Sequence, residues 1–85
     1  MNRIQIAAKL YDARDAMKFL YGERYEAEVR KTIIQLRQLS EVWKLSMIQT
    51  MTRACGEMAA KGDNGVGTGL VLAAYVEDVE GTITP

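Results

Sequence analysis

Histidine is absent from the 85 residues, and cysteine and proline occur once each. Without histidine the chain cannot build a Ser-His-Asp or Cys-His catalytic group, and it lacks the commonest zinc ligand. Cys55 has no partner for a disulfide within the chain, which is typical of a reducing compartment. Because Cys55 stands beside Ala54 and Gly56 with no visible base, we interpret it as a small buried hydrophobic residue rather than a nucleophile.

Long apolar runs are also missing. No stretch approaches the roughly 18 uninterrupted apolar residues of a membrane-spanning helix, and the first residues lack the apolar region of a signal peptide. We therefore predict a cytoplasmic protein without a membrane partner. The 48% hydrophobic and 26% charged content predicts a folded globular chain rather than a disordered one.

Net charge is zero, with eleven cations and eleven anions, which argues against gross electrostatic binding to nucleic acid. The two signs are distributed unevenly. Residues 1–62 hold every cation and seven of the anions, whereas residues 63–85 hold four anions and no cation. An acidic C-terminal segment beside a basic body is expected to fold back onto it or onto another copy.

The glycine-rich stretch "GDNGVGTG" at residues 62–69 raises the question of a phosphate-binding loop. A dinucleotide loop needs a preceding strand and a third glycine one residue later, and a P-loop ends in Lys-Ser or Lys-Thr. This stretch meets neither requirement, so we predict a flexible joint and no cofactor. The acids of residues 12–28 alternate with cations at helical spacing, which is typical of solvated ion pairs, so we predict no catalytic or metal site.

An amphipathic helix is predicted over residues 3–21. Asn2 is a suitable N-cap with Gln5 as its capping-box partner, and Gly22 is a suitable C-terminal stop. Between them, apolar residues recur in steps of three and four at Ile6, Leu10, Ala13, Met17 and Leu20.

A second apolar stripe begins at Tyr25 and continues to Met58, which predicts a long helix over residues 24–61. As one rod, residues 25–58 would extend about 50 Å, whereas a compact chain of this length is only about 30 Å across. Two alternatives follow. The helix breaks near "LSEVW" with Ser40 as an N-cap, or it stays long and packs against a second copy. The second half of this stretch is apolar on two sides, so we expect it to be sandwiched between other segments.

The C-terminal apolar segment over residues 70–80 is consistent with a helix or a strand, and alanines make the helix slightly favoured. Its acids near the C-terminus oppose a helix dipole, which counts against the helix. Residues 81–85 are predicted to fray. The sequence thus predicts one all-α domain over residues 1–85, a helical hairpin or small bundle.

Partner-binding residues are predicted at two places. Trp43 and Met47 lie on the long apolar stripe. Core packing is the ordinary explanation for apolar residues at this spacing, and a partner-binding surface is the more specific alternative. Aromatic residues gather around the first turn, and cations follow them on the next helix. The full predicted set is Trp43, Met47, Phe19, Tyr21, Tyr25, Arg30, Lys31 and Arg37.

Three functions are consistent with this pattern. The first is a non-enzymatic protein-binding module, which we expect to be a homodimer because the long helix could pack against a second copy. Its size and composition are typical of phage or mobile-element inhibitors of bacterial host or defence proteins, such as anti-CRISPR proteins. The second is a small dimeric helical regulator that binds nucleic acid through Arg24, Arg30, Lys31 and Arg37, although acids stand among these cations. The third is an oligomerisation adaptor.

Overall fold

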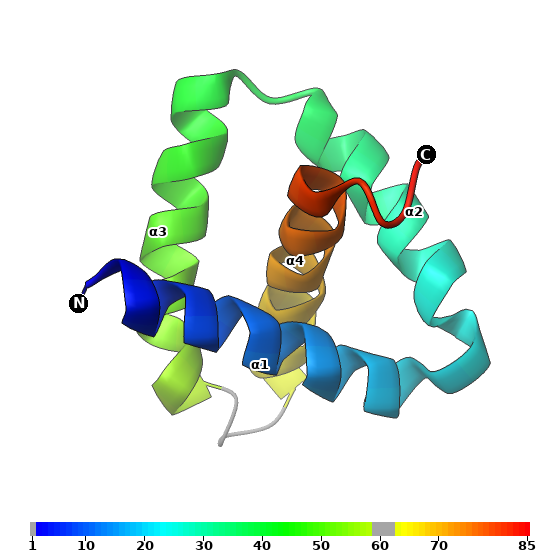
Figure 1. Ribbon diagram of the computed structural model, residues 1–85, viewed down its shortest axis with the longest axis horizontal. Helices are drawn as coiled ribbons and strands as arrows, with labels where there is room; N and C mark the ends of the chain where they lie inside the picture. The colour runs from blue at the N-terminus through cyan, green and yellow to red at the C-terminus, as the bar shows by residue number, and fades with distance from the viewer. Residues whose placement is uncertain (1, 59–62) are drawn as a thin grey trace.

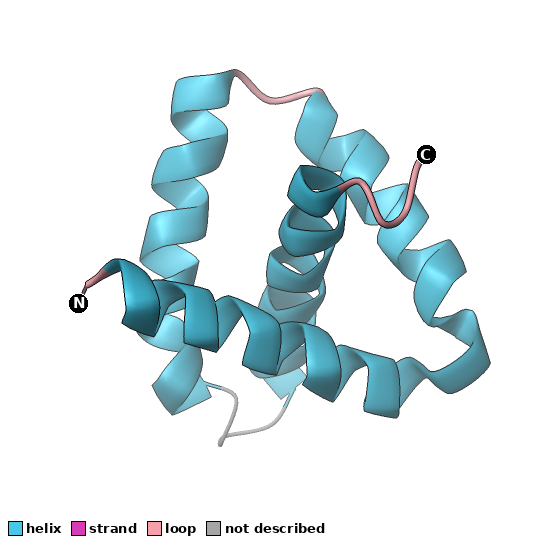
Figure 2. Ribbon diagram, viewed as in Figure 1, coloured by secondary structure: helices cyan, strands magenta, loops and turns pink. Residues whose placement is uncertain are grey.

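The computed structural model describes residues 2–58 and 63–85, with side chains over residues 2–54 and 67–85 (Figure 1). This part of the chain forms four α-helices and one 3₁₀ turn. The helices are α1 (Arg3–Tyr21), α2 (Tyr25–Arg37), α3 (Glu41–Met58) and α4 (Asp63–Glu80), and the turn is Gly22–Arg24. Because the described residues contain no strand, the predicted all-α fold is confirmed (Figure 2).

Local sequence signals set the ends of α1. The Asn2 side chain accepts a hydrogen bond from the Gln5 N–H at 2.9 Å, and the Gln5 side chain accepts one from the Asn2 N–H at 2.9 Å. This reciprocal pair is the predicted capping box. At the other end Gly22 has a φ of 56°, a value that favours glycine. The predicted helix over residues 3–21 is therefore confirmed.

The long apolar stripe is divided between two helices. The chain leaves α2 after Arg37 and enters α3 at Glu41, and the Trp43 N–H donates to the Ser40 hydroxyl oxygen at 3.3 Å. The break near Ser40 is thus the correct alternative, and a single continuous helix is wrong. It lets the chain fit within 30 × 29 × 21 Å. The end of the predicted helix, at residues 59–61, lies outside the described residues.

The central element is α4 rather than the second half of the long stripe. Leu72, Ala73 and Ala74 are completely buried, and α1, α2 and α3 all pack against α4 (Figure 1). The helical alternative for residues 70–80 is therefore correct. The expectation that the second half of the long stripe is sandwiched is wrong, because Val42 and Trp43 of α3 are 82% and 62% exposed. The helix with neighbours on several sides is α4.

Two apolar clusters fill the spaces around α4. One lies mainly between α4 and α2, and its fully buried members include Val29, Ile33 and Ala73. The other joins α4 to α1 and α3 through Leu72, Ala13 and Ile48. Both clusters therefore depend on α4.

The predicted flexible joint is largely helical. Residues 63–69 belong to α4, and residue 62 lies outside the described residues. Gly69 shows why glycine is useful here: a Cβ built on it would lie 2.8 Å from Cε of Met17 on α1. The missing side chain lets α1 cross close to α4. Tertiary packing overrides the low helix propensity of glycine at this crossing.

The C-terminal segment is ordered against the protein, contrary to the predicted fraying. Ile83 is 9% exposed and belongs to the apolar cluster between α2 and α4. Nε of Arg30 donates to the carbonyl oxygen of Thr84 at 3.1 Å. Gly81, with a φ of 70°, supplies the turn that sends the chain back from the end of α4.

Two glycine substitutions test the role of the α1–α4 crossing. Gly67 also lies in α4, but a Cβ there would have no atom within 4 Å. Gly67→Ala is expected to raise the free energy of unfolding by about 0.5–1 kcal/mol, because alanine favours the helix. Gly69→Ala gains the same propensity but must displace the buried Met17 side chain, so it should be less stable than Gly67→Ala by about 1 kcal/mol or more. Urea unfolding measures both values, and equal stabilisation would contradict the close crossing.

Candidate interaction surfaces

The exposed side of α3 carries the first candidate surface. Trp43 is 62% exposed, and it lines a hollow of about 290 Å³ together with Ser46, Met47, Thr50 and Met51. These residues follow one another at helical spacing, so they form a single face of α3, here named the α3 face. Trp43 and Met47 thus share one face, and partner binding there stays a prediction. Met47 is half-buried and also packs against the α2–α4 cluster, so it serves the core and the face together.

The opposite side of α3 is buried in the core, which holds the helix in place. Ile48 is 4% exposed and Thr52 is completely buried. The Thr52 hydroxyl donates to the carbonyl oxygen of Ile48 at 2.7 Å, so its burial leaves no unpaired donor. One side of α3 is therefore fixed in the core, while Trp43 faces outward.

The aromatic residues around the first turn do not share one surface. Phe19 is 92% exposed, Tyr21 is half-buried against the apolar core, and Tyr25 is only 6% exposed. Tyr25 begins α2 with its side chain inward, so its assignment to a partner surface is wrong. Leu20, which lies outside the predicted set, is 54% exposed next to Phe19. Phe19 and Leu20, the corner patch, form the second candidate surface, at the end of α1.

Each of the three cations assigned to a partner lies close to a carboxylate. Nη2 of Arg30 lies 2.7 Å from Oε1 of Glu26, and Nζ of Lys31 lies 3.4 Å from Oε1 of Glu28. These pairs are at the spacing of one helical turn within α2. Acids among the cations leave α2 without a basic stripe, which weakens the case for phosphate contact.

Arg37 makes the third of these pairs across the fold. Its Nη2 donates to Oδ1 of Asp78 at 2.6 Å, which joins α2 to the end of α4. The hydrogen bond to Asp78, and then the charge of Asp78, raise the pKa of Arg37. The acidic segment therefore folds back onto its own chain.

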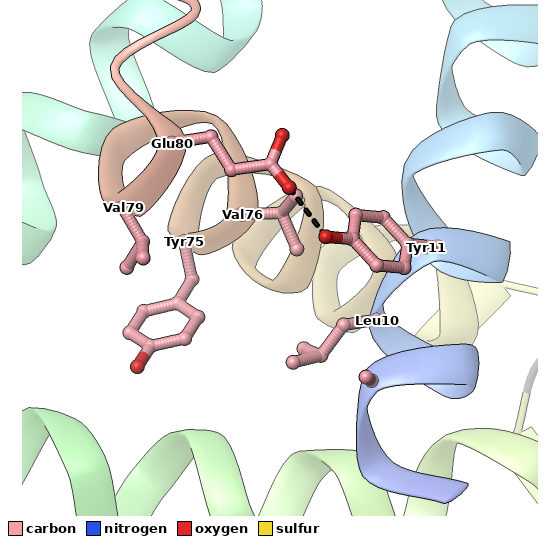
Figure 3. Close-up of a pocket in the computed structure, with 7 residues that line it drawn as sticks. Leu10, Tyr11, Tyr75, Val76, Val79 and Glu80 are labelled. Carbon is pink, nitrogen blue, oxygen red and sulfur yellow. Dashed lines mark hydrogen bonds between the residues drawn. The ribbon is translucent and has the colours of Figure 1, made fainter. Parts of the chain in front are cut away.

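A small cavity between α1 and α4 was not predicted from the sequence. Tyr11 of α1 and Glu80 of α4 are among the residues that line it, and the Tyr11 hydroxyl donates to Oε1 of Glu80 at 2.5 Å (Figure 3). This hydrogen bond, and then the charge of Glu80, raise the pKa of Tyr11. The walls are mostly apolar, and the volume is about 100 Å³. Typical ligand pockets measure about 300–1,000 Å³, so this cavity is too small for most organic ligands.

Glu77 and Tyr25 place two polar groups inside the core. Glu77 is 3% exposed, and its Oε1 accepts a hydrogen bond from the Thr82 hydroxyl at 3.0 Å. The Tyr25 hydroxyl is buried and has no hydrogen-bond partner within the described part of the chain. Burial, and then the negative charge of Glu77, raise the pKa of Tyr25. Neither group is open to a substrate, so the pair belongs to the core.

The described residues contain no group of three or more His, Cys, Asp or Glu side chains placed to hold a metal ion. The side chain of Cys55 lies outside the described residues, so its predicted burial stays a prediction. Among the helices described here, none combines the length and apolar character needed to cross a bilayer. Comparison of the chain with protein-family models, with curated proteins and with solved structures finds no match.

The buried hydroxyl of Tyr25 leads to a stability prediction with a defined pH dependence. Tyr25→Phe should leave the free energy of unfolding at neutral pH unchanged or raise it by up to about 1 kcal/mol, because an unpaired buried hydroxyl is removed. The folded-state pKa of Tyr25 is raised, so ionisation of this residue does not change the free energy of unfolding below the ordinary tyrosine pKa of about 10. Above this pH the unfolded chain ionises more readily than the folded one, and the free energy of unfolding falls.

Urea unfolding of wild type and Tyr25→Phe at pH 8 and pH 11 measures this effect. Between the two pH values, wild type should lose about 1 kcal/mol more than the variant. Equal losses in the two proteins would show that Tyr25 ionises as easily in the folded chain as in the unfolded one.

Proposed function

We propose that the chain is a small non-enzymatic protein-binding module. One observation carries the proposal: the single phenylalanine and the single tryptophan of the sequence are both mostly exposed, at 92% and 62%. Aromatic side chains usually supply much of the buried area of a core, and they are also enriched as anchors in protein interfaces. Here aliphatic residues and alanine fill most of the core, which leaves Phe19 and Trp43 available for partners.

The two anchors lie on different parts of the molecule. The end of α1, which carries Phe19, lies at the right of the view beside the start of α2, whereas α3 lies at the left (Figure 1). This separation supports a module with two contact surfaces, the corner patch and the α3 face. Two surfaces suit a chain that binds a target protein and also associates with itself, as in the predicted homodimer.

As the biological setting, we propose inhibition of a bacterial host or defence protein by a phage or mobile-element product, in the manner of an anti-CRISPR protein. A small helical chain with exposed aromatic anchors needs only to cover part of a larger protein to block it. The ion pairs of Arg30, Lys31 and Arg37 weigh against the nucleic-acid alternative, because phosphate groups would have to compete with carboxylates already in contact.

Substitutions at the two ends of α1 test the corner patch. Phe19→Glu places a charge at the proposed contact, whereas Ile4→Glu places the same charge at the other end, where Ile4 is 80% exposed. Both variants should keep the helical circular dichroism of wild type. Capture from a lysate of phage-susceptible bacteria should retain the same host protein on wild type and Ile4→Glu, with retention reduced about tenfold or more on Phe19→Glu.

Binding must then be paired with inhibition. In cells with active CRISPR–Cas immunity, expression of wild type or Ile4→Glu should restore phage plaques, and Phe19→Glu should not. Unchanged immunity would remove the anti-CRISPR setting, and equal capture by all three proteins would remove the corner patch. A gel shift with DNA or RNA at low salt that weakens steeply with added salt would favour the regulator instead.

A further inference from the structure

The α3 face combines one large projecting side chain, that of Trp43, with a hollow beside it. Trp43 lies near the beginning of the face, and the small side chains of Ser46 and Thr50 follow it along the helix. The Thr50 hydroxyl donates to the carbonyl oxygen of Ser46 at 3.0 Å, so the polar atom of Thr50 is paired within its own helix. A projection and a recess therefore lie side by side on one helix.

The five residues lining the hollow carry no charge. Lys44 lies beside them, but its side chain is only 14% exposed and its Nζ lies 3.0 Å from Oε2 of Glu41. When a surface packs against the same surface of a second copy around a two-fold axis, each residue near the axis lies close to its equivalent in the other copy. Charged residues at these positions would therefore repel one another. An uncharged lining removes this repulsion. It also offers little to attract a strongly charged partner.

The order of residues along α3 suits an antiparallel pair. Trp43 and Met51 lie four residues on either side of Met47, which is about 6 Å along the helix axis in each direction. A two-fold axis near Met47 brings Trp43 of each copy against Met51 and Thr50 of the other. Methionine sulfur packs favourably against aromatic rings, and the recess beside Thr50 gives the indole room.

We infer that the α3 face packs against the α3 face of a second copy, antiparallel and around a two-fold axis near Met47. This inference rests on the proposed function in one respect, since it leaves the corner patch to the target protein. The dimer then presents two corner patches, one from each copy. The site on α3 is a self-association surface, and its occupant is another molecule of this chain.

Two neighbouring substitutions on α3 test the inference. Thr50→Glu puts a carboxylate into the hollow, and Gln49→Glu adds the same charge at an exposed position outside the hollow. Light scattering on the purified full-length chains should give the mass of two chains for wild type and Gln49→Glu, and half that mass for Thr50→Glu. Circular dichroism checks that each chain is folded, and Trp43→Ala, which removes the projecting side chain, replaces Thr50→Glu if that variant loses its helices.

Trp43 also provides a direct signal, because it is the only tryptophan. Its emission should shift to shorter wavelength as the concentration of wild type or Gln49→Glu rises, and it should stay constant in Thr50→Glu. A wild-type mass of one chain at every concentration would overturn the inference. So would a dimer that neither Thr50→Glu nor Trp43→Ala dissociates, or a Trp43 shift that occurs only when the captured target protein is added.

The two proposals fail in different ways. Phe19→Glu should lose the target and keep the mass of two chains, whereas Thr50→Glu should lose the dimer and still bind the target through its single corner patch. A dimer without a target would leave the inference intact and remove the proposed function. A target-binding chain that is always monomeric would do the reverse.

Discussion

Close packing against α4 is the constraint on which the rest of the structure depends. Leu72, Ala73 and Ala74 are completely buried, and the other three α-helices all contact this helix. An 85-residue chain has little interior volume, so one helix must serve several neighbours at once. Small side chains make this arrangement feasible, because Ala73, Ala74 and Gly69 let neighbouring helices come near the α4 backbone. Residues that the core does not require, including Phe19 and Trp43, are left on the outside.

Short-range signals made much of the fold predictable. The capping box of Asn2 and Gln5, the glycine stop at residue 22 and the Ser40 cap each act within a few residues, so the sequence places them directly. The central position of α4 depends on contacts between distant segments. A glycine-rich stretch has low helix propensity by itself, and the close crossing with Met17 that makes Gly69 suitable there cannot be seen in the sequence.

The candidate surfaces were predictable only in part, for a related reason. An apolar stripe shows that a side chain faces something apolar, but it does not show whether that surface belongs to the same chain or to a partner. Tyr25 and Trp43 occupy the same stripe, yet Tyr25 is 6% exposed and Trp43 is 62% exposed. The break at Ser40 turns α3 away from the direction of α2, so Tyr25 faces the core while Trp43 faces outward. Similarly, Tyr11 and Glu80 are too far apart in sequence for their contact to be anticipated.

The acids at the end of α4 have a consequence for topology. Apolar residues are distributed similarly from either end of the apolar run of α4. Burial of this run alone would therefore not determine which end of the helix lies beside which neighbour. Arg14 of α1 approaches Glu80, with Nη1 3.6 Å from Oε2, while Arg37 of α2 holds Asp78 from the other side. Reversing α4 would separate both pairs and leave carboxylates beside apolar surface. The short connection between α3 and α4 already sets the direction of the central helix, and these two ion pairs add to the preference for the native orientation over its inverse.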